Sequence, residues 1–159
     1  VELIDLSERE YRLKNALQAG HATYDFILID CPPALNMLTV NGLVAADSVL
    51  IPMQCEYYAL EGLSDLVETL RKVRAHLNSR LEIEGLLRTM YNPQSTLTQQ
   101  VSGELESHFG SKVYKTIVPR NVRLAEAPSY GKPVIAFDKS SKGAQAYNAL
   151  AKEILERVA

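Results

Sequence analysis

The hydrophobic pattern of the chain alternates between short apolar runs and longer stretches with apolar residues at helical spacing. Residues 24–30, which read YDFILID, form a nearly unbroken apolar run, and residues 48–53, SVLIPM, form a second. Continuous rather than alternating apolarity indicates strands that are buried on both faces, as in a parallel sheet covered by helices. Further strands are predicted over residues 81–90, 112–118 and 133–137.

Helical periodicity lies between these runs. Apolar residues three and four apart predict a long amphipathic helix over 60–77, and other helices are predicted over 6–19, 38–46, 97–109 and 143–158. Ser7 and Glu10 have the spacing of a capping box at the start of the first helix. Strands that alternate with helices are typical of βαβ units. The sequence therefore predicts one α/β domain over residues 1–159, with a mostly parallel, twisted sheet and helices on both faces.

The composition is that of a folded globular protein, with 159 residues, 47% of them apolar and 23% charged. An aromatic content of 7% and the lack of Trp argue against stacking on nucleobases as the main activity. Cys31 and Cys55 are the only cysteines and have no zinc-ligand spacing, so we expect reduced thiols. No apolar run reaches membrane-spanning length, and the expected location is the cytoplasm.

Asp30 closes the first apolar run and is followed by Cys31, Pro32 and Pro33. Ligands of doubly wound sheets bind beyond the carboxyl ends of the strands. A strand that ends in Asp is the Walker B arrangement, in which the carboxylate holds Mg²⁺, directly or through water, beside nucleotide phosphates. The alternative is a structural Asp that caps the next helix or bonds the backbone of the Pro-Pro corner. This pattern alone leaves both interpretations open.

No phosphate cradle accompanies Asp30. The sequence contains no GxxxxGK[ST] motif and no glycine-rich loop between a strand and a helix. Such a loop supplies the backbone N–H groups and the lysine that hold a triphosphate. The chain by itself is therefore not expected to hydrolyse nucleotides.

Charge is distributed unevenly along the chain, whose net charge is −2. Residues 112–142 contain seven Lys and Arg against two acidic residues, a balance of +5, which leaves −7 for the remainder. This asymmetry favours an anionic partner such as a phosphate backbone. The alternative is a set of solvated loop charges scattered over several faces.

Four long segments of the sequence carry a resemblance to a known family. They are YDFILIDCPPALNMLTVNGLVAAD, IPMQCEYYALEGL, TMYNPQSTLTQQV and KVYKTIVPRNVRLAEAPSYGKPVIAFDKSSKGAQAY. Together they resemble the ParA/Soj family of chromosome- and plasmid-partitioning ATPases, a deviant Walker A class related to MinD. The resemblance runs in order from Val1 to Ala159 and implies a P-loop NTPase-like sheet with helices on both faces.

The resemblance implies roles for individual residues. Asp30 is similar to the Walker B aspartate that supports Mg²⁺, through water, and Cys31, Pro32 and Pro33 match the turn near the γ-phosphate. The residues that match the corners flanking the adenine are Thr89, Met90, Tyr91, Asn92, Pro119 and Arg120. The residues assigned to DNA are Arg123, Lys112 and Lys132. The implied cofactors are ATP and Mg²⁺.

The resemblance also implies a function for the intact protein. ATP would join two copies into a homodimer, the dimer would bind DNA without sequence specificity, and a ParB-type centromere-binding protein would stimulate hydrolysis. This activity would be cytoplasmic and nucleoid-associated, without a membrane. Two alternatives are a MinD-like membrane-associated positioning ATPase and a non-catalytic, truncated interaction module.

Family members begin with a KGG-x-GKT phosphate loop, upstream of the position that matches Val1. The chain is therefore expected to be the carboxyl-terminal two-thirds of a ParA-type ATPase domain, inactive alone because the Walker A loop is absent. The family strand that leads into this loop lies inside the sheet, so we also expect an apolar edge with unpaired backbone groups.

Overall fold

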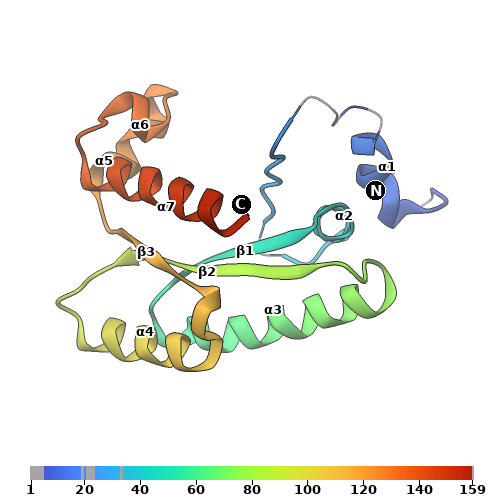
Figure 1. The fold of residues 1–159 in the computed structure, drawn as a ribbon, viewed down its shortest axis with the longest axis horizontal. Helices are drawn as coiled ribbons and strands as arrows, with labels where there is room; N and C mark the ends of the chain where they lie inside the picture. The colour runs from blue at the N-terminus through green and yellow to red at the C-terminus, as the bar shows by residue number, and fades with distance from the viewer. Residues whose placement is uncertain (1–5, 19, 21–23, 33, 159) are drawn as a thin grey trace. The chain divides into compact units, whose positions relative to one another are not determined.

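The computed structural model describes residues 6–18, 20, 24–32 and 34–158. Two compact units make up the chain: Val1–Val49 with Leu63–Ile83, and Leu50–Gly62 with Glu84–Ala159. The single domain expected from the sequence stays a prediction. Helices and strands alternate over the middle of the chain, from residue 37 to residue 119 (Figure 1).

Most of the predicted helices and strands are present, with boundaries that differ by one to a few residues. In chain order the elements, with η for a 3-10 helix, are η2 (Arg9–Tyr11), α1 (Arg12–Gln18), α2 (Met37–Ala45), β1 (Ser48–Gln54), α3 (Tyr57–His76), β2 (Glu82–Tyr91), α4 (Thr96–Phe109), η4 (Gly110–Lys112), β3 (Val113–Pro119), α5 (Val122–Glu126), η5 (Ala127–Tyr130), α6 (Val134–Phe137) and α7 (Lys142–Val158).

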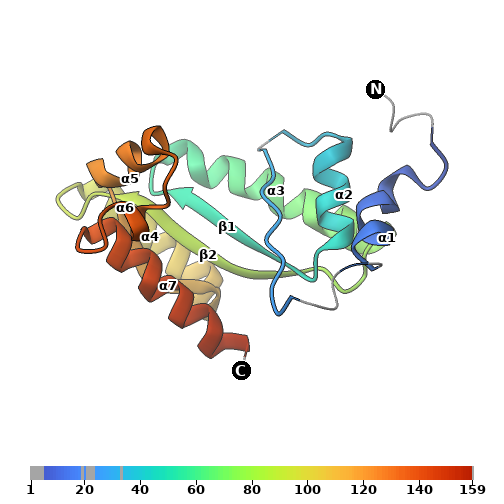
Figure 2. The same ribbon diagram turned by 90° about the horizontal axis from the view of Figure 1, so that it is seen from above.

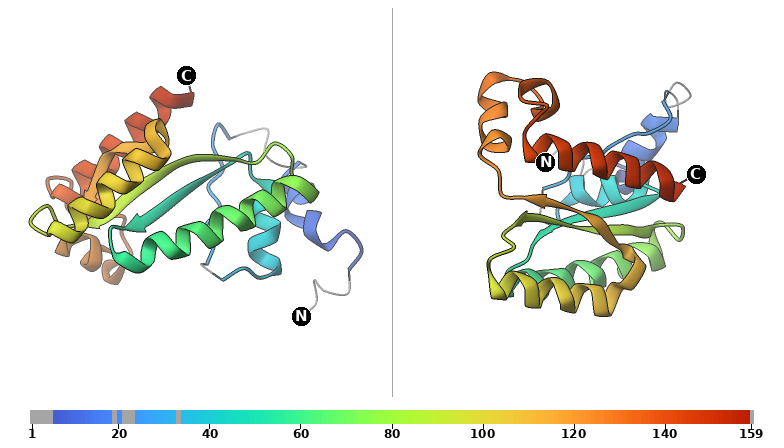
Figure 3. Two further views of the ribbon diagram at one scale, coloured as in Figure 1. Left: turned by 90° about the horizontal axis from the view of Figure 1, so that it is seen from below. Right: turned by 60° about the vertical axis from the view of Figure 1, so that its left-hand side comes forward.

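The strands form a three-stranded sheet in the order β1-β2-β3, and β2 pairs with β3 in parallel. Strands β1 and β2 run side by side along the sheet (Figure 2). In the second unit, α4 and α7 lie on opposite faces of this sheet (Figures 1 and 3). The predicted fold class, a parallel α/β sheet with helices on both faces, is confirmed.

The core of the second unit lies between α7 and the sheet. Its buried residues are Leu87, Tyr114, Val118 and Leu150, with Ala146 and Ile154 packed against them. The α7 members recur four residues apart and so share one helix face. Burial of one such leucine contributes about 2 kcal/mol, so this face fixes α7 to the sheet.

Gly85 allows β2 to lie close to the Tyr114 side chain of β3. A Cβ atom at Gly85 would lie 2.5 Å from Tyr114 Cε2 and 2.7 Å from the Lys112 carbonyl oxygen. Tyr114 is fully buried, and the Lys112 oxygen belongs to the backbone, so neither atom can move away cheaply. A side chain at this position of β2 is therefore incompatible with the observed strand pairing.

Arg88 ties β2 to its neighbours on both sides. Its side chain is buried, and its Nη1 donates to Ser102 Oγ of α4 at 2.8 Å. Its Nη2 donates to the Tyr114 carbonyl oxygen of β3 at 2.8 Å. Nη1 also forms an ion pair with Glu106, which compensates the buried charge. One guanidinium thereby links two strands and a helix.

Glu153 of α7 binds the backbone of β3. Its two carboxylate oxygens accept the N–H groups of Lys115 and Thr116, each at 2.8 Å, and Arg157 Nη2 donates to Oε1 at 2.9 Å. Burial alone would raise the pKa of Glu153, but the hydrogen bonds from Thr116, Lys115 and Arg157 outweigh burial and lower the pKa to about 2. The ionised carboxylate thus joins α7 to β3.

Two buried asparagines organise the first unit. Asn41 of α2 accepts the Leu13 N–H at 3.1 Å and donates to the Arg9 carbonyl oxygen at 2.8 Å, which holds α1 and η2 against α2. Asn78 donates to carbonyl oxygens near the end of α2, with the Ala46 oxygen at 2.8 Å. These bonds satisfy backbone groups at helix ends that have no partner within their own helix.

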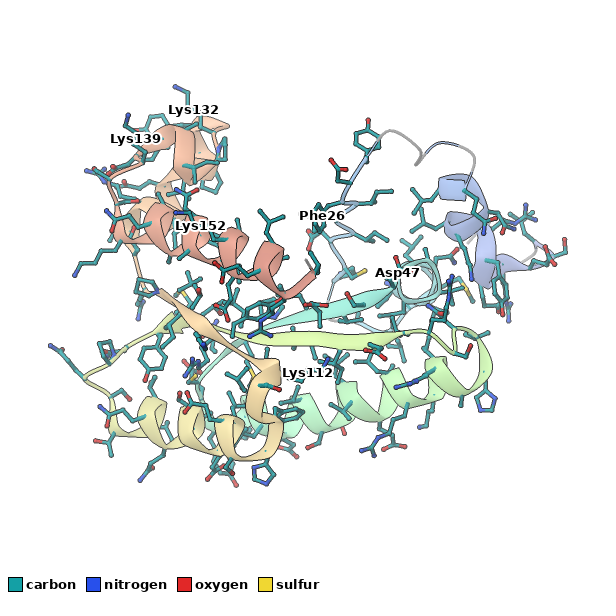
Figure 4. All side chains as sticks on the ribbon, viewed as in Figure 1. Phe26, Asp47, Lys112, Lys132, Lys139 and Lys152 are labelled. Carbon is teal, nitrogen blue, oxygen red and sulfur yellow. The ribbon has the colours of Figure 1, made fainter. Side chains whose placement is uncertain are left out.

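The strand predicted over residues 24–30 is not formed. Residues 24–32 belong to no strand, and Tyr24, Phe26 and Leu28 are 70%, 51% and 93% exposed. Figure 4 labels Phe26, whose side chain projects from this segment. Extended backbone becomes a strand only when a neighbour accepts its ladder hydrogen bonds, and no described segment does so for residues 24–32.

Two smaller predictions at the ends of elements are also wrong. Residues 133–137 form a helical turn, α6, instead of a strand, because Pro133 begins it with φ −66° and the Asp138 N–H closes it on the Val134 oxygen at 2.8 Å. The predicted Ser7 cap is absent: Glu8, with φ 52°, precedes η2 and makes no side-chain capping bond. The first predicted helix is instead split into η2 and α1.

The substitution Gly85→Ala is expected to lower the free energy of unfolding by about 2 kcal/mol, because the new methyl group overlaps Tyr114 and the backbone of Lys112. The control is Gly103→Ala in α4, where no atom lies within 4 Å of the added carbon. That change should raise the free energy by about 0.5–1 kcal/mol through helix propensity. Urea unfolding of both variants measures the difference, and an equal effect would refute the close packing at Gly85.

The low pKa of Glu153 predicts a pH-dependent contribution to stability. A depressed carboxyl pKa stabilises the fold above the unfolded value of 4.5, and this contribution is lost as the pH falls toward about 2. Glu153→Gln should lower the free energy of unfolding by about 3 kcal/mol near neutral pH, and by much less at the acid end of this window.

Denaturant unfolding across the window, with Glu156→Gln as the control, tests this. Glu156 lies on the same helix, is exposed and makes no side-chain hydrogen bond or ion pair with the described residues. A constant difference between Glu153→Gln and the unsubstituted chain at all pH values would contradict the prediction.

Candidate functional site

The carboxyl ends of the strands in the second unit bring together the residues predicted to flank a base. Tyr91 and Pro119 are register partners at the ends of β2 and β3, and the Arg120 N–H donates to the Tyr91 carbonyl oxygen at 3.3 Å. Thr89 Oγ1 donates to the Met53 carbonyl oxygen of β1 at 3.2 Å. Three strand ends therefore meet at one edge, where ligands of parallel sheets bind.

Met90 marks an irregularity in this cluster. The register advances by three residues in β2, from Arg88 to Tyr91, and by two in β3, from Ile117 to Pro119. The extra residue is a β-bulge, and Met90 has φ 51°, in the left-handed region that side chains rarely occupy. A bulge redirects the residues that follow it. Here those residues are Asn92 and the exposed loop that leads to α4.

Arg123 is held by two carboxylates. Its Nη1 lies 2.8 Å from Glu126 Oε2, three residues along α5, and its Nε lies 3.4 Å from Asp138 Oδ2 at the end of α6. The hydrogen bond and charge of Glu126, together with Asp138, raise the pKa of Arg123 above its ordinary value. We refer to Arg123, Glu126 and Asp138 as the Arg123 triad; its net charge is −1.

Other cations of the basic stretch are exposed. Side chains of Lys132 and Lys139 extend outward from the segment around α6 (Figure 4). Lys112, by contrast, precedes β3, whose seven residues separate it from Arg123 by about 20 Å along the strand. The three residues assigned to DNA therefore do not form one cluster: Lys112 lies at the opposite end of β3.

Asp30, Cys31 and Pro32 belong to the first unit, and all three are exposed. Cys31 Sγ would lie 2.8 Å from a Cβ atom at Gly42, so the segment rests on the glycine of α2. Within the part of the chain that the structure describes, the Asp30 carboxylate has no hydrogen bond or ion pair. Among the described residues, Asp30 therefore neither caps a helix nor bonds to a backbone group. Pro33 lies outside the described residues.

The described residues contain no group of three or more His, Cys, Asp or Glu that could hold a metal ion. Mg²⁺ in nucleotide sites needs no such cage, because it keeps several waters and binds through one or two carboxylates and the phosphates. Asp30, a single aspartate without a partner among the described residues, fits this requirement. Cys55 is no candidate ligand, since it is 3% exposed and its burial raises the pKa of its thiol.

Sequence reasoning missed the part played by Glu126 and Asp138, which entered only as two negative charges. The spacing of Arg123 and Glu126, three residues apart, was a usable signal once residues 122–126 were known to be helical. For Asp138 no signal existed, since its contact with Arg123 depends on how α6 follows η5.

None of the described helices is both long enough and apolar enough to span a bilayer.

The sheet, its helical layers and its strand-end cluster define a protein of the P-loop NTPase fold. A solved structure of this class, cobyrinic acid a,c-diamide synthase from Mycobacterium smegmatis with bound ATP analog and magnesium, matches with a TM-score of 0.77. It is 32% identical, over 97% of this chain and 56% of that chain.

A family model described as an AAA domain matches residues 1–83. The sporulation initiation inhibitor protein Soj of Bacillus subtilis is 56% identical over 97% of this chain and 61% of its own length. The chromosome partitioning protein ParA of Caulobacter vibrioides is 51% identical over 99% of this chain and 60% of its own length. The chain therefore belongs to this AAA-domain family. It is similar to ParA and Soj proteins and spans about 60% of their length.

Proposed function

We propose that the chain is the part of an ATP-dependent partitioning protein that supports Mg²⁺, flanks the adenine and contacts DNA. The observation that carries the proposal is the strand-end cluster of β1, β2 and β3 in a chain 51–56% identical to ParA and Soj. The name of the Caulobacter vibrioides relative, a chromosome partitioning protein, supports partition as the process. The chain itself contributes residues that fit each part of the task.

For the nucleotide, each unit offers residues that fit a role by themselves. Asp30 offers an exposed carboxylate that has no hydrogen bond or ion pair with the described residues, and Mg²⁺ bound through it would neutralise charge on the phosphates. Cys31 and Pro32 directly follow Asp30 and would shape the backbone beside the γ-phosphate. The corner at Tyr91 and Arg120 supplies backbone and side-chain atoms for the base. The sequence has no phosphate loop, so hydrolysis by this chain alone is not part of the proposal.

For DNA, the exposed cations after β3 supply the electrostatic contact. Arg120, Lys132, Lys139 and Lys142 are exposed and make no ion pair with the described residues. Neutralisation of backbone phosphates by such cations releases counterions and gives affinity that is independent of sequence and steeply dependent on salt. Arg123 adds to this surface through the part of its guanidinium that the two carboxylates do not bind.

The ATP-joined homodimer, the ParB-type partner and the cytoplasmic, nucleoid-associated location belong to the same proposal and rest on the resemblance to partitioning proteins. One observation argues against the membrane-associated alternative. Ala146, Leu150 and Ile154 of α7 pack on the sheet, so this face of the helix is not available to a bilayer.

Asp30→Asn in the complete gene product is expected to reduce Mg²⁺-dependent ATP turnover by about 10²-fold or more, because the amide carries no charge to support the ion. Asp25→Asn, an exposed acid in the same segment, is the control and should leave turnover unchanged. Steady-state phosphate release measures both variants. Full turnover in Asp30→Asn would remove this residue from the magnesium site.

Arg123→Gln in the complete gene product should weaken binding to a random-sequence duplex in the presence of ATP and Mg²⁺. The slope of log K against log salt should become shallower by about 0.9, the value for one lost phosphate contact. Arg74→Gln removes an exposed arginine of α3 that has no ion pair with the described residues, and serves as the control. An unchanged salt slope in Arg123→Gln would exclude Arg123 from the DNA surface.

A further inference from the structure

The Arg123 triad is an unusual arrangement for a residue that binds phosphate. An arginine that contacts DNA must present positive charge, yet Arg123 is flanked by Glu126 at 2.8 Å and Asp138 at 3.4 Å. One cation between two anions carries a net charge of −1. A phosphate that approaches this point is therefore repelled by the triad as a whole, within the screening distance of about 8 Å in physiological salt.

The two carboxylates are not equivalent. Asp138 is fixed by other bonds: its Oδ1 accepts the Ser140 N–H at 3.1 Å and the Ser140 hydroxyl at 2.7 Å, at the start of the turn into α7. The Glu126 side chain has Arg123 as its only partner among the described residues, and it is 40% exposed. Glu126 can therefore leave Arg123 by rotating into solvent, whereas Asp138 stays in place.

The Arg123 side chain itself remains 52% exposed, so a phosphate can reach it without unfolding α5. Its Nη2 group donates to no described residue, which leaves a donor for an incoming anion. Binding would then exchange the bond from Nη1 to Glu126 for one to phosphate. Exposed ion pairs are weak enough for such an exchange to be readily reversible.

We infer that Glu126 and Asp138 set the DNA affinity of this protein by competing with backbone phosphates for Arg123, with Glu126 as the partner that gives way. The inference rests on the proposed DNA-binding function and adds to it two acidic residues that limit affinity. A surface whose main arginine is neutralised in this way holds DNA weakly.

The test measures affinity for a random-sequence duplex, with ATP and Mg²⁺, over a range of salt concentrations in the complete gene product. Glu126→Gln removes the competitor and keeps the shape of the side chain. It should bind about two- to fivefold more tightly than the unsubstituted protein, with a salt slope steeper by up to about 0.9. Glu104→Gln makes the same change in net charge on α4, where the glutamate is exposed and its side chain has no partner among the described residues.

Two comparisons decide the result. Glu126→Gln must bind more tightly than Glu104→Gln, and the gain must disappear when Arg123→Gln is combined with Glu126→Gln, since the competition acts through Arg123. If Arg123→Gln weakens binding but the gain from Glu126→Gln persists in the double variant, or equals that of Glu104→Gln, the inference is overturned and the DNA surface stands. If Arg123→Gln binds as the unsubstituted protein does, the proposed role of Arg123 fails as well.

Discussion

The parallel pairing of β2 with β3 is the constraint on which the second unit depends. Gly85 leaves the space that Tyr114 fills, and Arg88 bonds at once to the backbone of β3 and to α4. Parallel strands end at the same edge of a sheet, so this pairing places Tyr91 and Arg120 side by side at the carboxyl ends of β2 and β3. The chain then enters α5 directly from that edge, so the corner formed by Tyr91 and Arg120 is followed at once by the basic segment.

The segment after β3 shows that the charge available to a partner differs from the charge counted along the chain. Residues 112–142 have a formal balance of +5, but Arg123 contributes nothing to it locally, because it is shared between two carboxylates. The positive charge that faces solvent lies on residues such as Lys132 and Lys139. Association with an anion would therefore begin at the lysines, with Arg123 as a later contact.

Residues 24–30 show that an apolar run with the composition of a buried strand need not form one. Their composition is typical of a strand buried on both faces, and the likeness of the chain to ParA and Soj extends through them. In this structure Phe26 and Leu28 face solvent, because burial and ladder bonds require neighbours that no described segment supplies. An apolar run is stable as a strand only if neighbouring segments bury its side chains and pair with its backbone. The surrounding structure decides whether such neighbours are present.

Local patterns in the sequence determined the α/β class, the three strands of the sheet and the long helices, since apolar periodicity reports directly on which faces are buried. They also singled out Asp30 and the strand ends, because ligand sites of parallel sheets have fixed places along the chain. Tertiary structure alone decided that residues 133–137 turn into α6, that Met90 takes a left-handed conformation at a bulge, and that Asp138 meets Arg123. Each of these depends on contacts between residues brought together by packing, and such contacts have no period in the sequence.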